Sequence, residues 1–312
     1  MTVTVLFAST DKDWAAYKDH LPTACAAAGV DATFTTDASI GEKADYIVYA
    51  PSSSVQDFTP FTNAKAVLSL WAGVESIVDN KTLTQPLCRM VDEGLTDGMV
   101  EWVTGHVLRY HLGMDAHIHG QDGEWRWDVL PPKARDRSVC ILGLGELGTA
   151  CALALKNLNF KTSGWSRRAK NIDGVTCHHG QQGLKDALST AEIVVTLLPD
   201  TPATENTLNI DTLSMLPKGA FILNPGRGPL IDDDALLGAL DSGQIAHATL
   251  DVFRVEPLPK DHPYWAHPRV TVTPHIAAAT RPSTASDVIA ENIRRGQAGE
   301  PFLHLVDRNA GY

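Results

Sequence analysis

Short apolar runs alternate with longer segments of helical spacing along most of the chain. Runs of strand length occupy residues 2–8, 31–36, 44–50, 65–71 and 86–91. An alanine-rich stretch predicts a helix near 12–28, which Pro22 bounds or interrupts. Valines and leucines at helical spacing predict a longer helix from about Asp97 to His117. Strands and helices in alternation are typical of parallel α/β sheets.

A second series of strands begins at Ser138–Leu142. Further strands are predicted at 161–165, 192–198, 220–223, 246–250 and 269–272. A last helical segment, near 282–296, follows the final strand, and a chain end in that position often packs back on the first domain. At 312 residues the chain is long for a single hydrophobic core, so two α/β domains are predicted.

Composition and charge narrow the class of protein. Hydrophobic residues make up 44% and charged residues 20% of the chain, as in ordinary globular proteins. The net charge of −11 argues against nucleic acid or an anionic membrane as a partner. The first residues lack the basic segment of a signal peptide, and the longest apolar run, 139–155, is too short to span a bilayer, which predicts a cytoplasmic protein. The five cysteines have no C-x-x-C spacing, which favours buried free thiols over disulfides or a metal site.

Three glycines have the spacing of a dinucleotide-binding turn. Gly143, Gly145 and Gly148 follow an apolar strand and open an alanine- and leucine-rich helix. Glycines there permit a tight turn, close approach of a pyrophosphate and close packing of the helix on the strand, while the helix start supplies free amide groups. We therefore expect these glycines, with Glu146 and Leu147, to bind a cofactor. The alternative is a tight turn without a ligand.

The strand after this motif indicates which dinucleotide is bound. An NAD site usually has an acidic residue about 20 residues further on, but here no acidic residue follows the strand before Asp173. Ser166, Arg167 and Arg168 occupy that place, and a hydroxyl with two guanidinium groups suits a 2′-phosphate. NADP(H) is therefore predicted over NAD(H), although two solvated arginines would leave NAD(H) possible. The loop after the next buried strand is expected to contribute Leu198, Pro199 and Thr204.

Three side chains have the chemistry that reduction of a keto acid requires. Arg227 follows an apolar strand between two glycines, where a guanidinium can bind a carboxylate and the adjacent carbonyl oxygen. His275 ends another strand just before small residues that leave room for a ligand, and histidine can donate a proton near neutral pH. Glu256 could orient the His275 ring and favour its protonated form. A loop arginine or a histidine taken singly is more often solvated than catalytic, but the three together indicate hydride transfer.

Several motifs along nearly the whole chain occur in the same order as the motifs of a known protein family. They are Leu-Trp-Ala-Gly-Val-Glu at 70–75, the glycine motif, Trp-Ser-Arg-Arg at 165–168, Asn-Pro-Gly-Arg-Gly at 224–228, Leu-Asp-Val-Phe at 250–253, Glu-Pro-Leu-Pro at 256–259 and Thr-Pro-His-Ile-Ala-Ala at 273–278. With these motifs the chain resembles the D-2-hydroxyacid dehydrogenases, and among them the glyoxylate/hydroxypyruvate reductase A type. Trp71 and Glu75 depart from residues common in that family, so the substrate is left open by the resemblance.

The resemblance implies a role for each matching position. Arg227 would bind the substrate carbonyl and carboxylate, His275 would be the general acid and base, and Glu256 its partner. Asp251 would lie near the nicotinamide carboxamide. The remaining implied contacts are to the cofactor for Pro225 and Gly226, and to the substrate for Trp71, Ala72, Gly73 and Val74.

The sequence thus predicts an α/β protein with two doubly wound parallel-sheet domains around a cleft. A flavodoxin-like substrate domain would contain residues 1–98 with 286–312, and a Rossmann dinucleotide-binding domain would contain 99–285. The expected activity is NADPH-dependent reduction of a small anionic 2-oxo acid, glyoxylate or hydroxypyruvate, and the resemblance implies a homodimer. The alternatives are an NADH-dependent D-2-hydroxyacid dehydrogenase of other specificity and a non-catalytic cofactor-sensing protein on the same fold.

Overall fold

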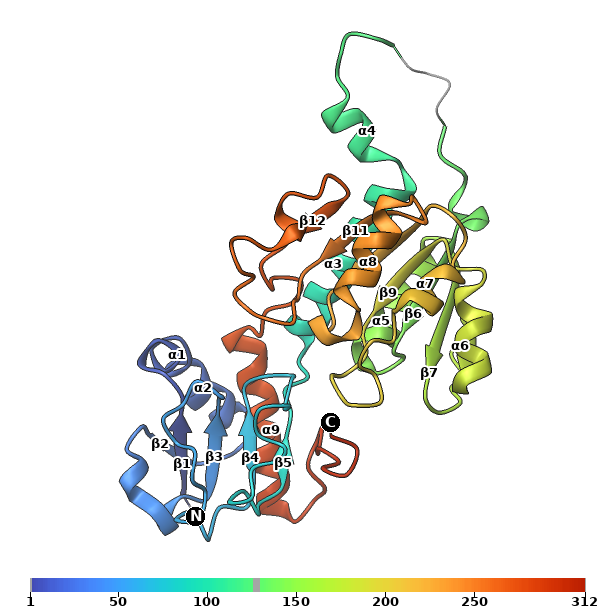
Figure 1. Ribbon diagram of the computed structural model, residues 1–312. Helices are drawn as coiled ribbons and strands as arrows, with labels where there is room; N and C mark the ends of the chain where they lie inside the picture. The colour runs from blue at the N-terminus through green and yellow to red at the C-terminus, as the bar shows by residue number, and fades with distance from the viewer. Residues whose placement is uncertain (1, 126–129, 312) are drawn as a thin grey trace. The chain divides into compact units, whose positions relative to one another are not determined.

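The computed structural model describes residues 2–125 and 130–311, and the chain divides into two compact units. Unit 1 contains the residues up to Leu95 and those from Ala279 onward, and unit 2 contains Thr96–Ala278. The chain leaves unit 1 inside helix α3 (Glu93–His111) and returns to it shortly before helix α9 (Pro282–Ala298). Each unit is a sheet covered by helices and loops (Figure 1).

Unit 1 is built on a five-stranded parallel sheet in the order β2–β1–β3–β4–β5. The strands are β1 (Val3–Ala8), β2 (Ala32–Thr35), β3 (Tyr46–Tyr49), β4 (Val67–Ser69) and β5 (Leu87–Cys88). Helices α1 (Asp11–Tyr17), α2 (His20–Ala27) and α9 bury one face, and the chain between β3 and β5 buries the other. A short 3₁₀ helix, η1 (Ala38–Lys43), connects β2 to β3. The central strands are apolar on both sides because both faces are covered.

Unit 2 is built on a seven-stranded parallel sheet in the order β12–β11–β10–β9–β6–β7–β8. The strands are β6 (Ser138–Leu142), β7 (Lys161–Ser166), β8 (Thr176–His179), β9 (Ile193–Thr196), β10 (Ala220–Asn224), β11 (Ile245–Leu250) and β12 (Val270–Val272). One face packs on α3 and α5 (Glu146–Asn157), and the other on α6 (Gly180–Leu188), α7 (Ile210–Ser214) and α8 (Asp233–Asp241). The strand order reverses between β6 and β9, where doubly wound folds bind dinucleotides.

Shorter elements complete unit 2. They are α4 (Met114–His119) and the 3₁₀ helices η2 (Ala134–Asp136), η3 (Gly228–Leu230) and η4 (Pro263–Trp265). Helix η3 directly follows Arg227, and η4 follows the segment that contains Glu256, so both lie close in sequence to predicted catalytic residues.

Two doubly wound parallel sheets were predicted, and this fold class is confirmed. Three local predictions differ from the structure. Strand β8 was not predicted because its four residues, Thr-Cys-His-His, are largely polar and lie at the sheet edge. The helix expected near 12–28 is two helices, and Pro22 lies in the first turn of the second, where proline is tolerated. The helix expected from Asp97 to His117 ends at His111, because Gly113 adopts a φ of 62° that separates α3 from α4.

All five cysteines are free thiols, and all but Cys177 are buried. Burial raises the pKa of the Cys140 thiol to about 12, so this thiol stays protonated and unreactive at neutral pH. The prediction of buried free thiols is therefore confirmed for four cysteines, and Cys177 is half-buried. In the part of the chain that the structure describes, no helix has the length and apolar character needed to cross a membrane.

Candidate functional site

The ends of three neighbouring strands of unit 2 lie side by side. Parallel pairing sets Asn224 of β10 beside Leu250 of β11, and Leu250 beside Val272 of β12. Arg227 comes three residues after the first of these strand ends, and His275 three residues after the last. The carboxyl ends of parallel strands form the ligand-binding edge of a doubly wound sheet. The topology therefore brings the predicted catalytic segments to this one edge.

Glu256 and His275 form a direct pair. Nδ1 of His275 lies 2.7 Å from Oε2 of Glu256. The other carboxylate oxygen of Glu256 accepts the amide hydrogen of Phe253 at 2.9 Å, which orients the carboxylate. A carboxylate at Nδ1 fixes the orientation of the ring and leaves Nε2 as the nitrogen that can exchange a proton with a ligand. The His275 side chain is 53% exposed, so a small molecule can reach it.

A buried aspartate holds the turn that carries His275. Asp251 is fully buried, and its carboxylate accepts hydrogen bonds from the Thr273 hydroxyl at 2.5 Å and from the amides of Ile276 at 3.0 Å and Ala277 at 2.9 Å. The Asp251 carbonyl also accepts the His275 amide at 2.8 Å. His275 has a φ of 54°, a left-handed conformation that costs free energy for residues other than glycine, and these bonds stabilise it. Asp251 thus positions His275, and its contact with the nicotinamide stays a prediction.

A buried asparagine shapes the turn that presents Arg227. The Asn224 side chain donates to the Arg227 carbonyl at 2.9 Å, and its oxygen accepts the Gly226 amide at 3.2 Å and the Thr196 hydroxyl at 2.6 Å. A Cβ at Gly226 would lie 2.6 Å from the Thr196 carbonyl oxygen, so a larger residue does not fit there. Pro225 is buried in the same turn. Asn224 and Thr196 had no predicted role, and their only sequence signal is a polar residue at the end of an apolar strand.

The glycine turn after β6 packs closely against its neighbours, as the turns that bind dinucleotides do. Gly143 has a φ of 109°, and a Cβ there would lie 2.4 Å from a carbonyl oxygen of the loop after β9. A Cβ at Gly148 would lie 1.8 Å from the Gly143 carbonyl oxygen, so helix α5 approaches the turn closely only because this residue is glycine. Gly145 is exposed, with open space where a Cβ would project. This space and the first amides of α5, at Glu146 and Leu147, fit a pyrophosphate.

The residues predicted to bind a 2′-phosphate lie next to this turn. The carbonyl of Trp165 in β7 accepts the Gly143 amide at 2.8 Å. Ser166 is the last residue of β7, and its hydroxyl donates to the Arg168 carbonyl at 2.8 Å. Arg167 and Arg168 are both exposed, so their guanidinium groups can contact an anion that lies beside the glycine turn.

The loop after β9 lies at the same edge of the sheet, because Thr196 pairs with Leu142 at the end of β6. Leu198 is buried in the core of unit 2. The Thr204 hydroxyl donates to the Pro199 carbonyl at 2.6 Å and accepts the amide of Thr201 at 3.0 Å. In this structure the Thr204 side chain therefore stabilises the loop itself, and cofactor contacts of the loop stay a prediction.

Unit 1 contains a separate candidate loop, directly after β4. The Ser69 hydroxyl oxygen accepts the Trp71 amide at 3.0 Å, and the Trp71 side chain is 49% exposed. Within residues 2–125 and 130–311, three consecutive amide groups of this loop donate no hydrogen bond to the protein: those of Ala72, Gly73 and Val74. Such amides are suitable donors to a carboxylate.

These features define a class of protein. A glycine turn at the switch point of a doubly wound sheet, together with a carboxylate–histidine pair at the same edge, is the arrangement of a dinucleotide-dependent oxidoreductase. The family model described as "D-isomer specific 2-hydroxyacid dehydrogenase, NAD binding domain" matches residues 106–277. A glyoxylate/hydroxypyruvate reductase A from Yersinia enterocolitica is 40% identical over 280 residues, which cover 87% of this chain and 88% of that protein.

Solved structures agree with this match. A D-isomer specific 2-hydroxyacid dehydrogenase from Xanthobacter autotrophicus Py2, in complex with NADPH and MES, is 39% identical with a TM-score of 0.91 and covers 100% of both chains. An NADPH-dependent glyoxylate/hydroxypyruvate reductase from Sinorhizobium meliloti, in complex with NADP and sulfate, is 33% identical with a TM-score of 0.84 and covers 100% of this chain and 99% of that one. The chain belongs to the D-isomer specific 2-hydroxyacid dehydrogenase family and is an NAD(P)-dependent oxidoreductase, so the predicted family and enzyme class are confirmed.

Proposed function

We propose that this protein uses NADPH to reduce a small 2-oxo acid, glyoxylate or hydroxypyruvate, to the 2-hydroxy acid. The observation that carries the proposal is the Glu256–His275 pair. These residues and Arg227 come after strands that end at the same edge of the sheet. Relatives that are glyoxylate/hydroxypyruvate reductases, and solved relatives with NADPH or NADP bound, support the substrate and the cofactor. Unit 2 is proposed to bind the cofactor, and unit 1 to contribute substrate-binding groups.

The proposed chemistry assigns one task to each side chain. When bound, the nicotinamide supplies the hydride. Arg227 binds the substrate carboxylate and carbonyl oxygen through its planar guanidinium and stabilises the negative charge that develops on that oxygen. His275, oriented by Glu256, donates a proton to the same oxygen. The amides of the loop that follows Trp71 are proposed as further donors to the carboxylate: Ala72, Gly73 and Val74.

The proposal is tested by the loss of reduced-nicotinamide absorbance with NADPH or NADH and a panel of 2-oxo acids. We expect turnover with NADPH, and a higher kcat/KM for glyoxylate or hydroxypyruvate than for 2-oxo acids with larger side chains. Better turnover with NADH would favour a dehydrogenase of other specificity. Binding of NADPH without turnover of any 2-oxo acid would favour a cofactor-sensing protein.

Glu256→Gln should lower kcat for reduction. Glutamine keeps the size of the side chain, but its amide cannot accept from both the His275 ring nitrogen 2.7 Å away and the Phe253 amide, as the carboxylate does. The ring should therefore be oriented less well for proton transfer, whereas the affinity for NADPH should change little.

The measurement is kcat with NADPH and the best 2-oxo acid of the panel, together with the dissociation constant of NADPH. Glu192→Gln is the matched control, because Glu192 is also a paired carboxylate, 3.1 Å from Arg137, but precedes β9 at the opposite edge of the sheet. An unchanged kcat for the Glu256 variant would show that the pair does not act in catalysis.

The double replacement Arg167→Ala and Arg168→Ala should weaken NADPH use far more than NADH use. Each charge-assisted contact with a 2′-phosphate contributes about 1.5–3 kcal/mol, so the wild type should prefer NADPH by at least about tenfold in kcat/KM. The preference should shrink in added salt because both arginines are exposed. Lys161→Ala removes an exposed cation at the opposite end of β7 and should leave the preference unchanged. Equal losses for both cofactors would mean that the arginines only shape the loop.

We also propose that the protein is a homodimer that associates through the region of α4, which projects from the rest of unit 2 (Figure 1). Large apolar side chains are exposed there: Leu112, Met114, Ile118, Trp125 and Leu130. Large exposed apolar side chains favour association, and a second copy would cover these. Light scattering should give the mass of two chains, and Ile118→Asp should shift it toward one. A wild type that is monomeric at micromolar concentration would contradict this proposal.

A further inference from the structure

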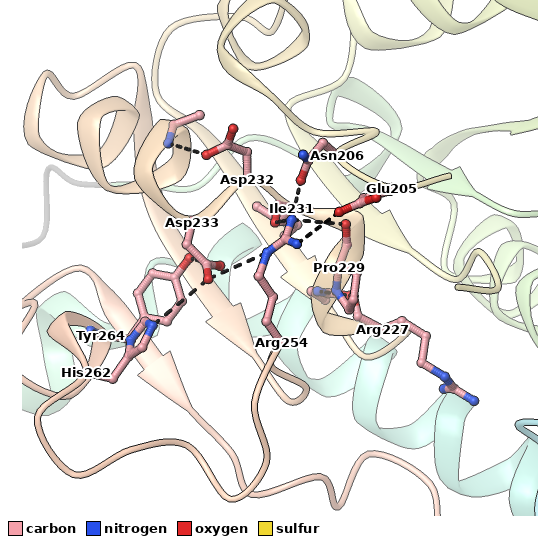
Figure 2. Close-up of polar contacts among 12 residues, drawn as sticks. Glu205, Asn206, Arg227, Pro229, Ile231, Asp232, Asp233, Arg254, His262 and Tyr264 are labelled. Atoms are coloured by element: carbon pink, nitrogen blue, oxygen red, sulfur yellow. Dashed lines mark hydrogen bonds and ion pairs between the residues drawn. The ribbon is translucent and has the colours of Figure 1, made fainter. Parts of the chain in front are cut away.

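We propose that Arg254 is a positioning residue that ties the loop bearing Arg227 to the segment bearing Glu256. The inference rests on the proposed function, because both of those residues are assigned tasks there. Figure 2 shows the Arg254 side chain surrounded by acceptors from several loops, while the Arg227 side chain extends away from them. Arg254 itself has no assigned part in binding the substrate or the cofactor.

The guanidinium of Arg254 binds the backbone just beyond Arg227. Its Nη2 donates to the Ile231 carbonyl at 2.8 Å and to the Pro229 carbonyl at 3.3 Å. These carbonyls lie four and two residues after Arg227, on either side of the end of η3. Contacts with backbone atoms constrain the path of the loop directly, whereas contacts with side chains leave the backbone free to shift.

The two segments also touch backbone to backbone. A Cβ at Gly228 would lie 2.0 Å from the carbonyl carbon of Phe253 and 2.3 Å from the amide nitrogen of Arg254. The Phe253 amide, in turn, donates to the Glu256 carboxylate at 2.9 Å. The segment that holds the Arg227 loop is therefore the same one that orients the partner of His275.

A third loop is attached at the same point. The side-chain oxygen of Asn206 accepts a hydrogen bond from Arg254 Nη2, and the Asn206 amide donates to the Pro229 carbonyl at 2.9 Å (Figure 2). Asn206 has a φ of 52°, which asparagine tolerates better than most residues. This loop follows β9 and contains Thr204, a predicted cofactor residue. One guanidinium thus joins three loops at the carboxyl edge of the sheet.

The charges around Arg254 favour arginine over other residues. Glu205 lies 3.4 Å from Nη1 and Asp233 lies 3.8 Å from Nε, and Asp233 also accepts the Tyr264 hydroxyl at 2.9 Å. A planar guanidinium can satisfy several such acceptors at once, which the single ammonium of lysine cannot. The Arg254 side chain is 32% exposed, so its ion pairs contribute little stability, and the main effect of its loss should be on geometry.

The test uses Arg254→Lys and Arg254→Met in the full chain, with Arg269→Met as the matched control. Arg269 also donates to a backbone carbonyl, that of Leu240 at 2.7 Å, but it precedes β12 at the opposite edge of the sheet. Both Arg254 variants should lower kcat/KM on the order of 10- to 100-fold, because small displacements of reacting groups have effects of this size. The dissociation constant of NADPH should change much less than kcat/KM, and Arg254→Lys should not restore the activity.

Two further measurements separate positioning from general destabilisation. Hydrogen–deuterium exchange should become faster in residues 225–232 and 251–257 of the Arg254 variants, but not in the Arg269 variant. Arg254→Met combined with Glu256→Gln should be non-additive in kcat/KM, whereas Arg269→Met with Glu256→Gln should be additive.

The exchange and kinetic results decide whether Arg254 is a positioning residue. Unchanged exchange in both segments, or kcat/KM values equal to those of the Arg269 variant, would overturn it. If the methionine variant does not fold, the lysine variant carries the same measurements. A wild type without reductase activity would instead refute the proposed function, and the exchange measurement would still show whether Arg254 holds the two segments together.

Discussion

Arg227→Lys is expected to lower kcat/KM for the 2-oxo acid on the order of 100-fold or more, which corresponds to about 3 kcal/mol of transition-state stabilisation. Lysine keeps the positive charge but cannot present a planar pair of donors to a carboxylate and a carbonyl oxygen together. The loss should therefore appear in substrate binding and in stabilisation of the developing alkoxide. Steady-state kinetics with NADPH and the best substrate of the panel measure it.

The turn around Arg227 makes this variant easy to interpret. The Asn224 side chain holds the turn through its bonds to the Arg227 carbonyl and the Gly226 amide, so the loop should keep its shape although the guanidinium's own bond to the Gly226 carbonyl, at 2.7 Å, is lost. Arg269→Lys is the control for a change of arginine to lysine elsewhere in unit 2, and it should be near wild type. Near-wild-type kinetics for Arg227→Lys would exclude Arg227 from the substrate site.

His275→Ala is expected to lower kcat by about 10²- to 10⁴-fold, the usual contribution of a general acid. The ring is proposed to act on the substrate oxygen, so the affinity for NADPH, measured by fluorescence titration, should change little. Because His275 has a φ of 54°, alanine also strains the backbone. His275→Asn avoids this difficulty, since asparagine tolerates the left-handed region, and it should be equally inactive.

His267→Ala is the matched control for these histidine variants. His267 pairs with Asp241 at 3.3 Å, as His275 pairs with Glu256, but it precedes β12, whereas His275 follows it. The control should keep wild-type turnover. Substantial activity in His275→Asn would assign the proton transfer to another group.

Much of the fold was predictable because its signals are local. A buried strand needs only a short apolar run, and most strands of both sheets correspond to such runs. The spacing of the glycine motif is equally local, and Gly148 is required by a contact within its own turn, whereas Gly143 is required by the loop after β9. Strand β8 was missed because an edge strand with exposed polar residues lacks this apolar signal.

The site residues are a different case, because their types were visible in the sequence but their arrangement was not. By itself the sequence determined the two doubly wound sheets, the glycine turn and the presence of an arginine, a glutamate and a histidine after three strands. Only the tertiary structure decided the strand register that aligns Asn224, Leu250 and Val272, and the way the buried Asp251 carboxylate holds the His275 turn. It also decided the contacts of Arg254 with the loop beyond Arg227. Periodicity reports which face of an element is buried, whereas hydrogen bonds between distant loops depend on how the whole sheet is assembled.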